Sequence, residues 1–175
     1  MNTKAGALVL FLALAYAPLA SAQSAGSDLA GWGRTTWGMT RQEILAAHPD
    51  QARPARSGEP GDLVVEDVVL AGLPFEARLF IGPHGLSRVF LTARRSDLTP
   101  AVRGRVERAL AADMGEGLAV SRRPEEREVA WTFPSTDVRL LYSRVETPDV
   151  NWQGLFVVFS RADARAAASV QSVSR

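Results

Sequence analysis

The residues best able to do chemistry are few in this chain. Its two histidines, His48 and His84, have no second ligand at the spacing of a metal site. There is no cysteine, and no serine lies in a nucleophile motif, so covalent catalysis lacks its usual starting group. We therefore expect structural or solvent-facing roles for both histidines. We also expect no metal site, no cofactor and no catalytic residue.

Carboxylates offer a second possibility. Glu66 and Glu128, together with Arg78, could serve a small carboxylate-based hydrolase or a pocket for a small ligand in the periplasm. Acid–base work of this kind needs carboxylates that converge on one reacting centre. Glu66 and its neighbour Asp67 point to opposite sides of a strand, so that adjacent pair cannot share a substrate. The hydrolase or pocket protein is the alternative function that the sequence leaves open.

Arginine and aromatic side chains indicate a different kind of site. Period-two spacing within the strand-like runs predicts one apolar sheet face and one mixed face. Arginines and aromatics on a rigid surface are favoured at protein interfaces, although a merely solvated face is the alternative interpretation. Trp152 is predicted to lie in a polar connecting loop and to be exposed. The predicted binding residues are Arg78, Phe80, Thr132, Arg139 and Trp152.

Two helix starts organise the elements that carry these residues. Thr40 and Glu43 form a capping box, and Pro49 ends that helix near Ala47. A second helix starts after Thr99, with Pro100 in its first position. Six strand-like runs separated by turn residues cover 63–70, 73–81, 86–93, 127–133, 136–145 and 154–160.

The order of elements repeats as one helix followed by three strands. The first unit spans 23–96, the second 97–162, and a tail covers 163–175. One such unit leaves a sheet face bare unless its helix and the other unit help to cover it. We therefore predict a single α+β domain in which two α-β-β-β units form one six-stranded antiparallel sheet with both helices on one face. The mixed face would then be open.

The first residues indicate the compartment. Residues 1–22 combine a positively charged start, a continuous apolar run and a small-x-small ending, which is the plan of a cleaved signal peptide. We predict cleavage after Ala22 and, because there is no cysteine to accept a lipid, no stable membrane attachment afterwards. The expected location is the periplasm or the medium.

Charge excludes one class of partner. Lys4 is the only lysine, so its loss with the signal peptide leaves 19 arginines against 19 acidic residues. A neutral chain lacks the electrostatic attraction that dominates nucleic-acid binding. We expect a monomer whose partner is another envelope protein or component.

Three stretches resemble known exported proteins: WGMTRQEILAAHP (37–49), GLPFEARLFIGPHGLSRVFL (72–91) and EVAWTFPSTDVRLLYSR (128–144). They are similar to an uncharacterised group of exported bacterial proteins with two helix-plus-three-strand modules. In architecture this group resembles the β-lactamase inhibitor proteins and the small lipoproteins of outer-membrane assembly. The missing cysteines depart from both, since one carries disulfides and the other a lipidated cysteine. The resemblance implies a non-enzymatic binding or scaffolding protein of the cell envelope.

Overall fold

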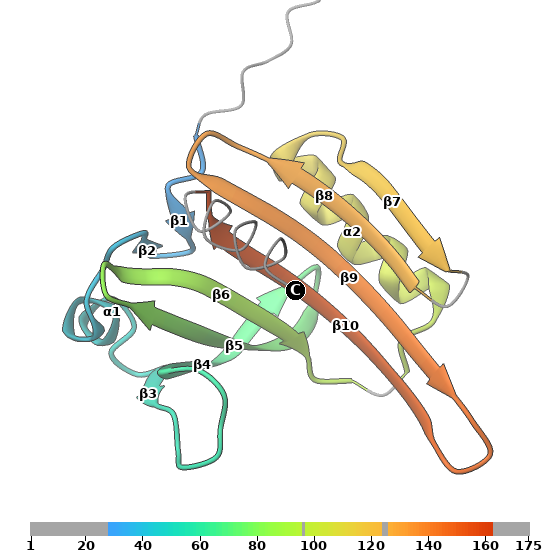
Figure 1. The fold of residues 1–175 in the computed structure, drawn as a ribbon, viewed down its shortest axis with the longest axis horizontal. Coiled ribbons are helices and arrows are strands. Elements are labelled where there is room, and N and C mark those ends of the chain that lie inside the picture. The colour runs from blue at the N-terminus through green and yellow to red at the C-terminus, as the bar shows by residue number, and fades with distance from the viewer. Residues whose placement is uncertain (1–27, 96, 124–125, 163–175) are drawn as a thin grey trace, which may run out of the picture.

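The computed structural model describes residues 28–95, 97–123 and 126–162. The predicted signal peptide and tail lie outside these ranges. Within these ranges, two helices and ten strands follow one another (Figure 1). Their bounds are β1 Gly31–Trp32, β2 Thr35–Thr36, α1 Arg41–Ala47, β3 Ala52–Pro54, β4 Leu63–Leu70, β5 Leu73–Gly82, β6 Gly85–Ala93, α2 Pro100–Met114, β7 Leu118–Arg123, β8 Glu126–Thr132, β9 Thr136–Glu146 and β10 Asn151–Arg161.

The main sheet has eight strands in the order β3-β4-β5-β6-β10-β9-β8-β7, and every neighbouring pair is antiparallel. The order reads as two runs of four strands that meet where β6 pairs with β10. A separate two-stranded sheet joins β1 to β2. The fold is therefore α+β, as the sequence predicts.

The prediction of six strands was wrong. The two additional strands, β3 and β7, lie at the edges of the sheet. β3 has three residues in a segment rich in proline and glycine, and it exists because Ala52, Arg53 and Pro54 pair with β4. β7 contains several polar residues and so lacks the apolar alternation that marks a half-buried strand. Pairing with a neighbour, rather than local pattern, makes these segments strands.

Both helix starts are as the sequence predicts. The Thr40 backbone N–H donates to Glu43 Oε2 at 2.7 Å, and the Glu43 backbone N–H donates to Thr40 Oγ1 at 3.4 Å. In α2, the Val102 backbone N–H donates to Thr99 Oγ1 at 3.3 Å. These contacts use N–H groups that have no partner within the helix, so the choice of start is a local matter.

A single core cluster occupies one face of the sheet. Ile44 of α1 and Val102, Val106 and Leu110 of α2 belong to this cluster together with alternate residues of the strands. Burial of one large aliphatic side chain is worth roughly 1.5–3 kcal/mol relative to exposure, so a layer of this kind can support a domain without disulfides. The inward strand residues include Leu63, Phe75, Ala77, Leu79, Val89, Leu91, Val129, Trp131, Val138, Leu140, Leu155 and Val157.

The segment before α1 is bound to the middle of the sheet through Thr136. This residue is buried at the start of β9. Its Oγ1 accepts a hydrogen bond from Trp37 Nε1 at 2.7 Å and donates to the Leu29 carbonyl. The Asp28 carboxylate accepts hydrogen bonds from the backbone N–H and the hydroxyl of Ser135. Residues about a hundred positions apart are thereby joined.

The β9–β10 hairpin reaches beyond its neighbours (Figure 1). Pairing of β9 with β8 ends at Ser143, and pairing of β10 with β6 ends at Phe156. β9 and β10 nevertheless continue to pair with each other as far as Glu146 and Asn151. The end of the hairpin is therefore a two-stranded extension of the sheet.

Candidate interaction surface on the second sheet face

The face opposite the core cluster is called the second face here. Strand register places Arg78, Phe90, Val158 and Arg139 in one row across β5, β6, β10 and β9 on this face. All four side chains are half-buried or exposed, in contrast to their inward neighbours. The prediction that the strands have one apolar and one mixed face is confirmed at these positions.

Three rings form a continuous strip along the second face, which we call the aromatic strip. Phe90 and Phe156 lie with their ring centroids 5.2 Å apart, and the Trp152 ring lies 6.1 Å from Phe156 at an interplanar angle of 27°. Gly154 sits between Trp152 and Phe156 on the same strand face. A Cβ at Gly154 would lie 2.4 Å from Phe156 Cζ and 2.7 Å from Trp152 Cη2. The glycine is what allows the two rings to meet over the strand.

Four of the five exposed large hydrophobic side chains among the described residues lie on the second face. The five are Val69, Leu118, Val145, Val150 and Trp152, each between 42% and 72% exposed. Register pairs Val69 with Pro74, Leu118 with Ala130 and Val145 with Trp152, so the four that lie in strands are on the second face. Val150 lies in the hairpin connection. Val69 in β4 and Leu118 in β7 are six strand spacings apart, so only Val145 and Trp152, which pair directly, form the contiguous exposed apolar patch that is typical of interaction surfaces.

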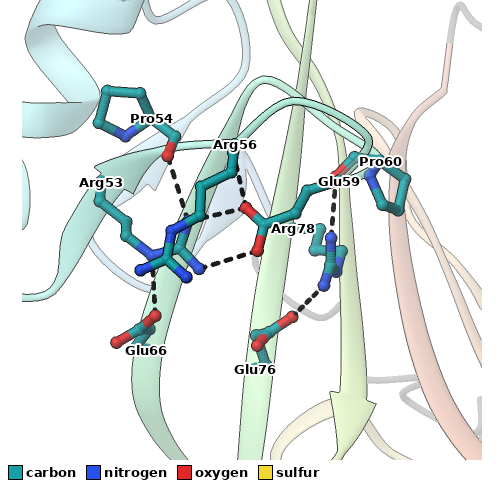
Figure 2. Close-up of polar contacts among 8 residues, drawn as sticks. All are labelled: Arg53, Pro54, Arg56, Glu59, Pro60, Glu66, Glu76 and Arg78. Atoms are coloured by element: carbon teal, nitrogen blue, oxygen red, sulfur yellow. Dashed lines mark hydrogen bonds and ion pairs between the residues drawn. The ribbon is translucent and has the colours of Figure 1, made fainter.

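Arg78, a predicted binding residue, is held by intramolecular contacts (Figure 2). Its Nη2 lies 2.7 Å from Glu76 Oε1, its Nη1 donates to the Pro60 carbonyl at 3.2 Å, and its side chain is 21% exposed. The connection between β3 and β4 therefore lies against this part of the second face. Arg78 anchors that connection and is a poor candidate for contact with a partner.

A second arginine holds the same connection. Arg53 Nε donates to Glu66 and its Nη1 donates to Glu59, both at 2.8 Å, and the Arg56 backbone N–H donates to Glu59 at 2.7 Å (Figure 2). These contacts lower the pKa of Glu59 to about 2, chiefly through the hydrogen bonds from Arg53. Val64 lies in register between Arg53 and Arg78 and is fully buried without belonging to the core cluster. This end of the second face is closed, whereas the aromatic strip is not.

The other predicted binding residues are distributed along the face. Phe80 is half-buried opposite Arg88, and Thr132 is exposed opposite Asp137. Arg139 Nη1 lies 3.2 Å from Glu128 Oε1, with half of its side chain exposed. Trp152 lies in β10, so its predicted place in a loop was wrong. The strand continues through it because β9 and β10 keep pairing beyond the rest of the sheet. Only Trp152 of the five joins the aromatic strip.

The carboxylates of the hydrolase alternative do not converge. Glu66 is in β4 and Glu128 in β8, five strand spacings apart in the sheet. At about 4.8 Å per spacing the two backbones are roughly 24 Å apart, far beyond the separation of a catalytic pair. The pKa of Glu66 is lowered by its hydrogen bond from Arg53, which keeps the carboxylate ionised. Among the described residues, no group of three or more histidine, cysteine or acidic side chains could hold a metal ion.

A cleft lies beside the exposed tryptophan. Its lining consists of Arg94, Arg95, Asn151, Trp152 and Gln153. The Arg95 guanidinium is paired with the Asp97 carboxylate, with Nε 2.7 Å from Oδ1. Arg94 is exposed, and its side chain makes no hydrogen bond or ion pair within the part of the chain that the structure describes. We call this the Trp152 cleft.

Sequence reasoning missed most of the strip although a signal for it was present. The last strand starts at Asn151, and the sequence-based prediction started it at residue 154. With the earlier start, the alternation of side chains along the strand puts Trp152, Gly154, Phe156 and Val158 on one face. The contribution of Phe90 could not be found in the same way, because it depends on β6 and β10 being neighbours.

None of the described helices has the length and apolar character needed to cross a membrane. No protein-family model matches the chain, and no curated protein does so either. A solved structure with partial similarity is the crystal structure of a DUF4309 family protein, YjgB, from Bacillus subtilis subsp. subtilis str. 168. It superposes with a TM-score of 0.41 and 12% sequence identity over 78% of this chain and 88% of that protein. A similarity of this size does not define a family.

Proposed function

We propose that this chain is a non-enzymatic exported binding or scaffolding protein of the cell envelope, and that it docks another protein on its second sheet face. The observation that supports this is the aromatic strip together with the exposed valines beside it. Trp152 and Val145 are directly opposite each other in the hairpin, and both are more than 40% exposed. Tryptophan set among other apolar side chains is a frequent anchor of protein interfaces.

The rigid setting of the strip favours the same function. Phe90 and Phe156 belong to paired strands inside the eight-stranded sheet, and the Trp152 ring, in the two-stranded extension, is braced by Phe156 over Gly154. A side chain that is already held in place loses less conformational freedom when a partner binds. The charged pair of Arg139 with Glu128, on the same face, would stand at the rim of an interface.

The location is part of the proposal. We propose that residues 1–22 are removed after Ala22, which would place the folded domain in the periplasm or outside the cell. The partner would then be another protein of the envelope, and the domain itself would be a monomer before it binds.

Site-specific photo-crosslinking tests the docking face. A photoreactive phenylalanine analogue is placed at position 145 or 152 on the second face, and at Asp113, an exposed position of α2, as the control. We expect one discrete crosslinked protein from positions 145 and 152 in living cells, and none from position 113. Equal crosslinking from all three positions, or crosslinking from 113 alone, would place the partner elsewhere and refute the proposal.

Loss of the indole gives a second measurement. Trp152→Ser should abolish the crosslink from position 145 without unfolding the domain, because nearly half of the Trp152 side chain is already exposed. Thermal unfolding of the variant is the control for folding. An undiminished crosslink in a folded Trp152→Ser protein would exclude the strip as the docking site.

A further inference from the structure

The Trp152 cleft adds a charge to the docking face. Two arginines, an asparagine, a glutamine and a tryptophan line it. Arg95 is neutralised by Asp97, which leaves the Arg94 guanidinium as the charge that a ligand could meet. A guanidinium binds a carboxylate through two parallel hydrogen bonds, and this geometry is both strong and selective.

Arg94 is held beside the aromatic strip by the sheet. Its backbone N–H donates to the Pro74 carbonyl at 2.9 Å, so the residue is still fixed to β5 beyond the end of β6. Pairing of Thr92 with Phe156 means that a continued register would bring position 94 opposite Gly154. Gly154 is the residue over which the rings of Trp152 and Phe156 meet. The Arg94 residue and the strip therefore lie next to each other.

We propose that the Trp152 cleft receives an acidic side chain of the docked partner, with Arg94 binding its carboxylate while a neighbouring apolar side chain packs on Trp152. The inference rests on the proposed docking function and names the chemistry of the partner. The partner segment would carry aspartate or glutamate next to a large apolar residue. Charge complementarity selects it, because the two described carboxylates that interact with these arginines are already bonded, Asp97 to Arg95 and Glu66, which also feels the charge of Arg94, to Arg53.

Selection from a library of random twelve-residue peptides displayed on phage tests the inference. The mature chain, residues 23–175, is immobilised as the wild type and as the Arg94→Glu and Arg88→Glu variants. Arg88 is the matched control, because it is exposed on the second face of β6, the strand that Arg94 directly follows. Six residues along a strand separate it from Arg94 by roughly 20 Å, which places it outside the cleft.

The wild type and Arg88→Glu should enrich peptides with aspartate or glutamate beside an aromatic or aliphatic residue. Arg94→Glu should lose the acidic preference and gain a preference for lysine and arginine. For one synthesised acidic peptide, Arg94→Glu should weaken binding about ten-fold or more, because a charge-assisted hydrogen bond is replaced by repulsion. An unchanged acidic preference in Arg94→Glu, or its equal loss in Arg88→Glu, would overturn the inference.

Two further outcomes separate this inference from the docking function. Peptides without acidic residues that still require Trp152 would refute the role of Arg94 and leave docking on the strip intact. Peptides that bind equally well to a folded Trp152→Ser variant would refute both. A competition experiment tests the choice of a protein partner. Polygalacturonate and the free peptide are each used to displace the bound acidic peptide. If polygalacturonate displaces it at the lower concentration, the cleft binds an acidic polysaccharide and the choice of a protein partner is overturned.

Discussion

Replacing Thr136 with valine should loosen the attachment of the N-terminal segment to the sheet. The hydroxyl of this fully buried residue accepts from Trp37 Nε1 at 2.7 Å and donates to the Leu29 carbonyl. Valine fills the same volume, but it can neither accept a hydrogen bond from Trp37 nor donate one to the Leu29 carbonyl. Each hydrogen bond is worth about 1 kcal/mol net, and a buried partner left unsatisfied costs about 1–3 kcal/mol.

The free energy of unfolding should therefore fall by about 2 kcal/mol, because Trp37 and Leu29 are only partly buried and water can satisfy some of the loss. For a domain of about 150 residues this corresponds to a Tm lower by about 4–8 °C. Chemical unfolding, followed by tryptophan fluorescence and by far-UV circular dichroism, measures the change. Thr136→Ser is the matched control, since it keeps the hydroxyl and removes only a methyl group.

A double-mutant cycle with Trp37→Phe tests whether the two residues act together. The indole N–H and the hydroxyl are partners, so the loss in the double variant should be smaller than the sum of the single losses by about 1 kcal/mol. If Thr136→Val and Thr136→Ser lose the same stability, or if the cycle is additive, the hydroxyl does not anchor this segment.

Three other changes should have measurable effects. Gly154→Ala places a Cβ 2.4 Å from Phe156 Cζ, so it should cost about 1–3 kcal/mol of stability and alter the near-UV circular dichroism of the strip; an unchanged spectrum would contradict the contact. Burial lowers the pKa of His48 below its ordinary 6.5, so the unfolded chain binds a proton first and stability should fall as the pH falls below about 6.5. His48→Gln should remove this slope in urea unfolding, whereas His84→Gln, at an exposed position, should retain it. The pKa of Glu59 is lowered from 4.5 to about 2, so its contribution is complete above pH 4.5 and is lost towards pH 2; Glu59→Gln should flatten the acid limb of the stability curve, and an unaltered limb would assign acid sensitivity to other carboxylates.

Local signals in the sequence account for much of the secondary structure. Thr40 and Thr99 start the helices because their hydroxyls reach backbone N–H groups three residues ahead, a distance set within one turn. Alternation in β5 separates Phe75 and Leu79 from Arg78 because successive side chains point to opposite faces of any strand. Neither feature depends on which elements become neighbours.

The sequence-based prediction did not find the edge strands or the end of the β9–β10 hairpin, because these elements depend on their neighbours in the sheet. β3 has only three residues and β7 ends in Ser121, Arg122 and Arg123, and each is a strand because a partner strand supplies its hydrogen bonds. Trp152 lies beside turn-forming residues, and it is in a strand because it pairs with Val145. These assignments depend on long-range pairing that no short window of sequence contains.

The sequence by itself determined the helix starts, the two-faced strands and the arginine-and-aromatic character of the second face, because each follows from the chemistry of residues a few positions apart. Only the tertiary structure decided which of those side chains form a surface. It bound Arg78 to Glu76 and Pro60, and it joined Phe90 to Phe156 by making β6 and β10 neighbours. The physical reason is that contacts between strands far apart in the chain arise from the cooperative burial of the whole core, which no local pattern encodes.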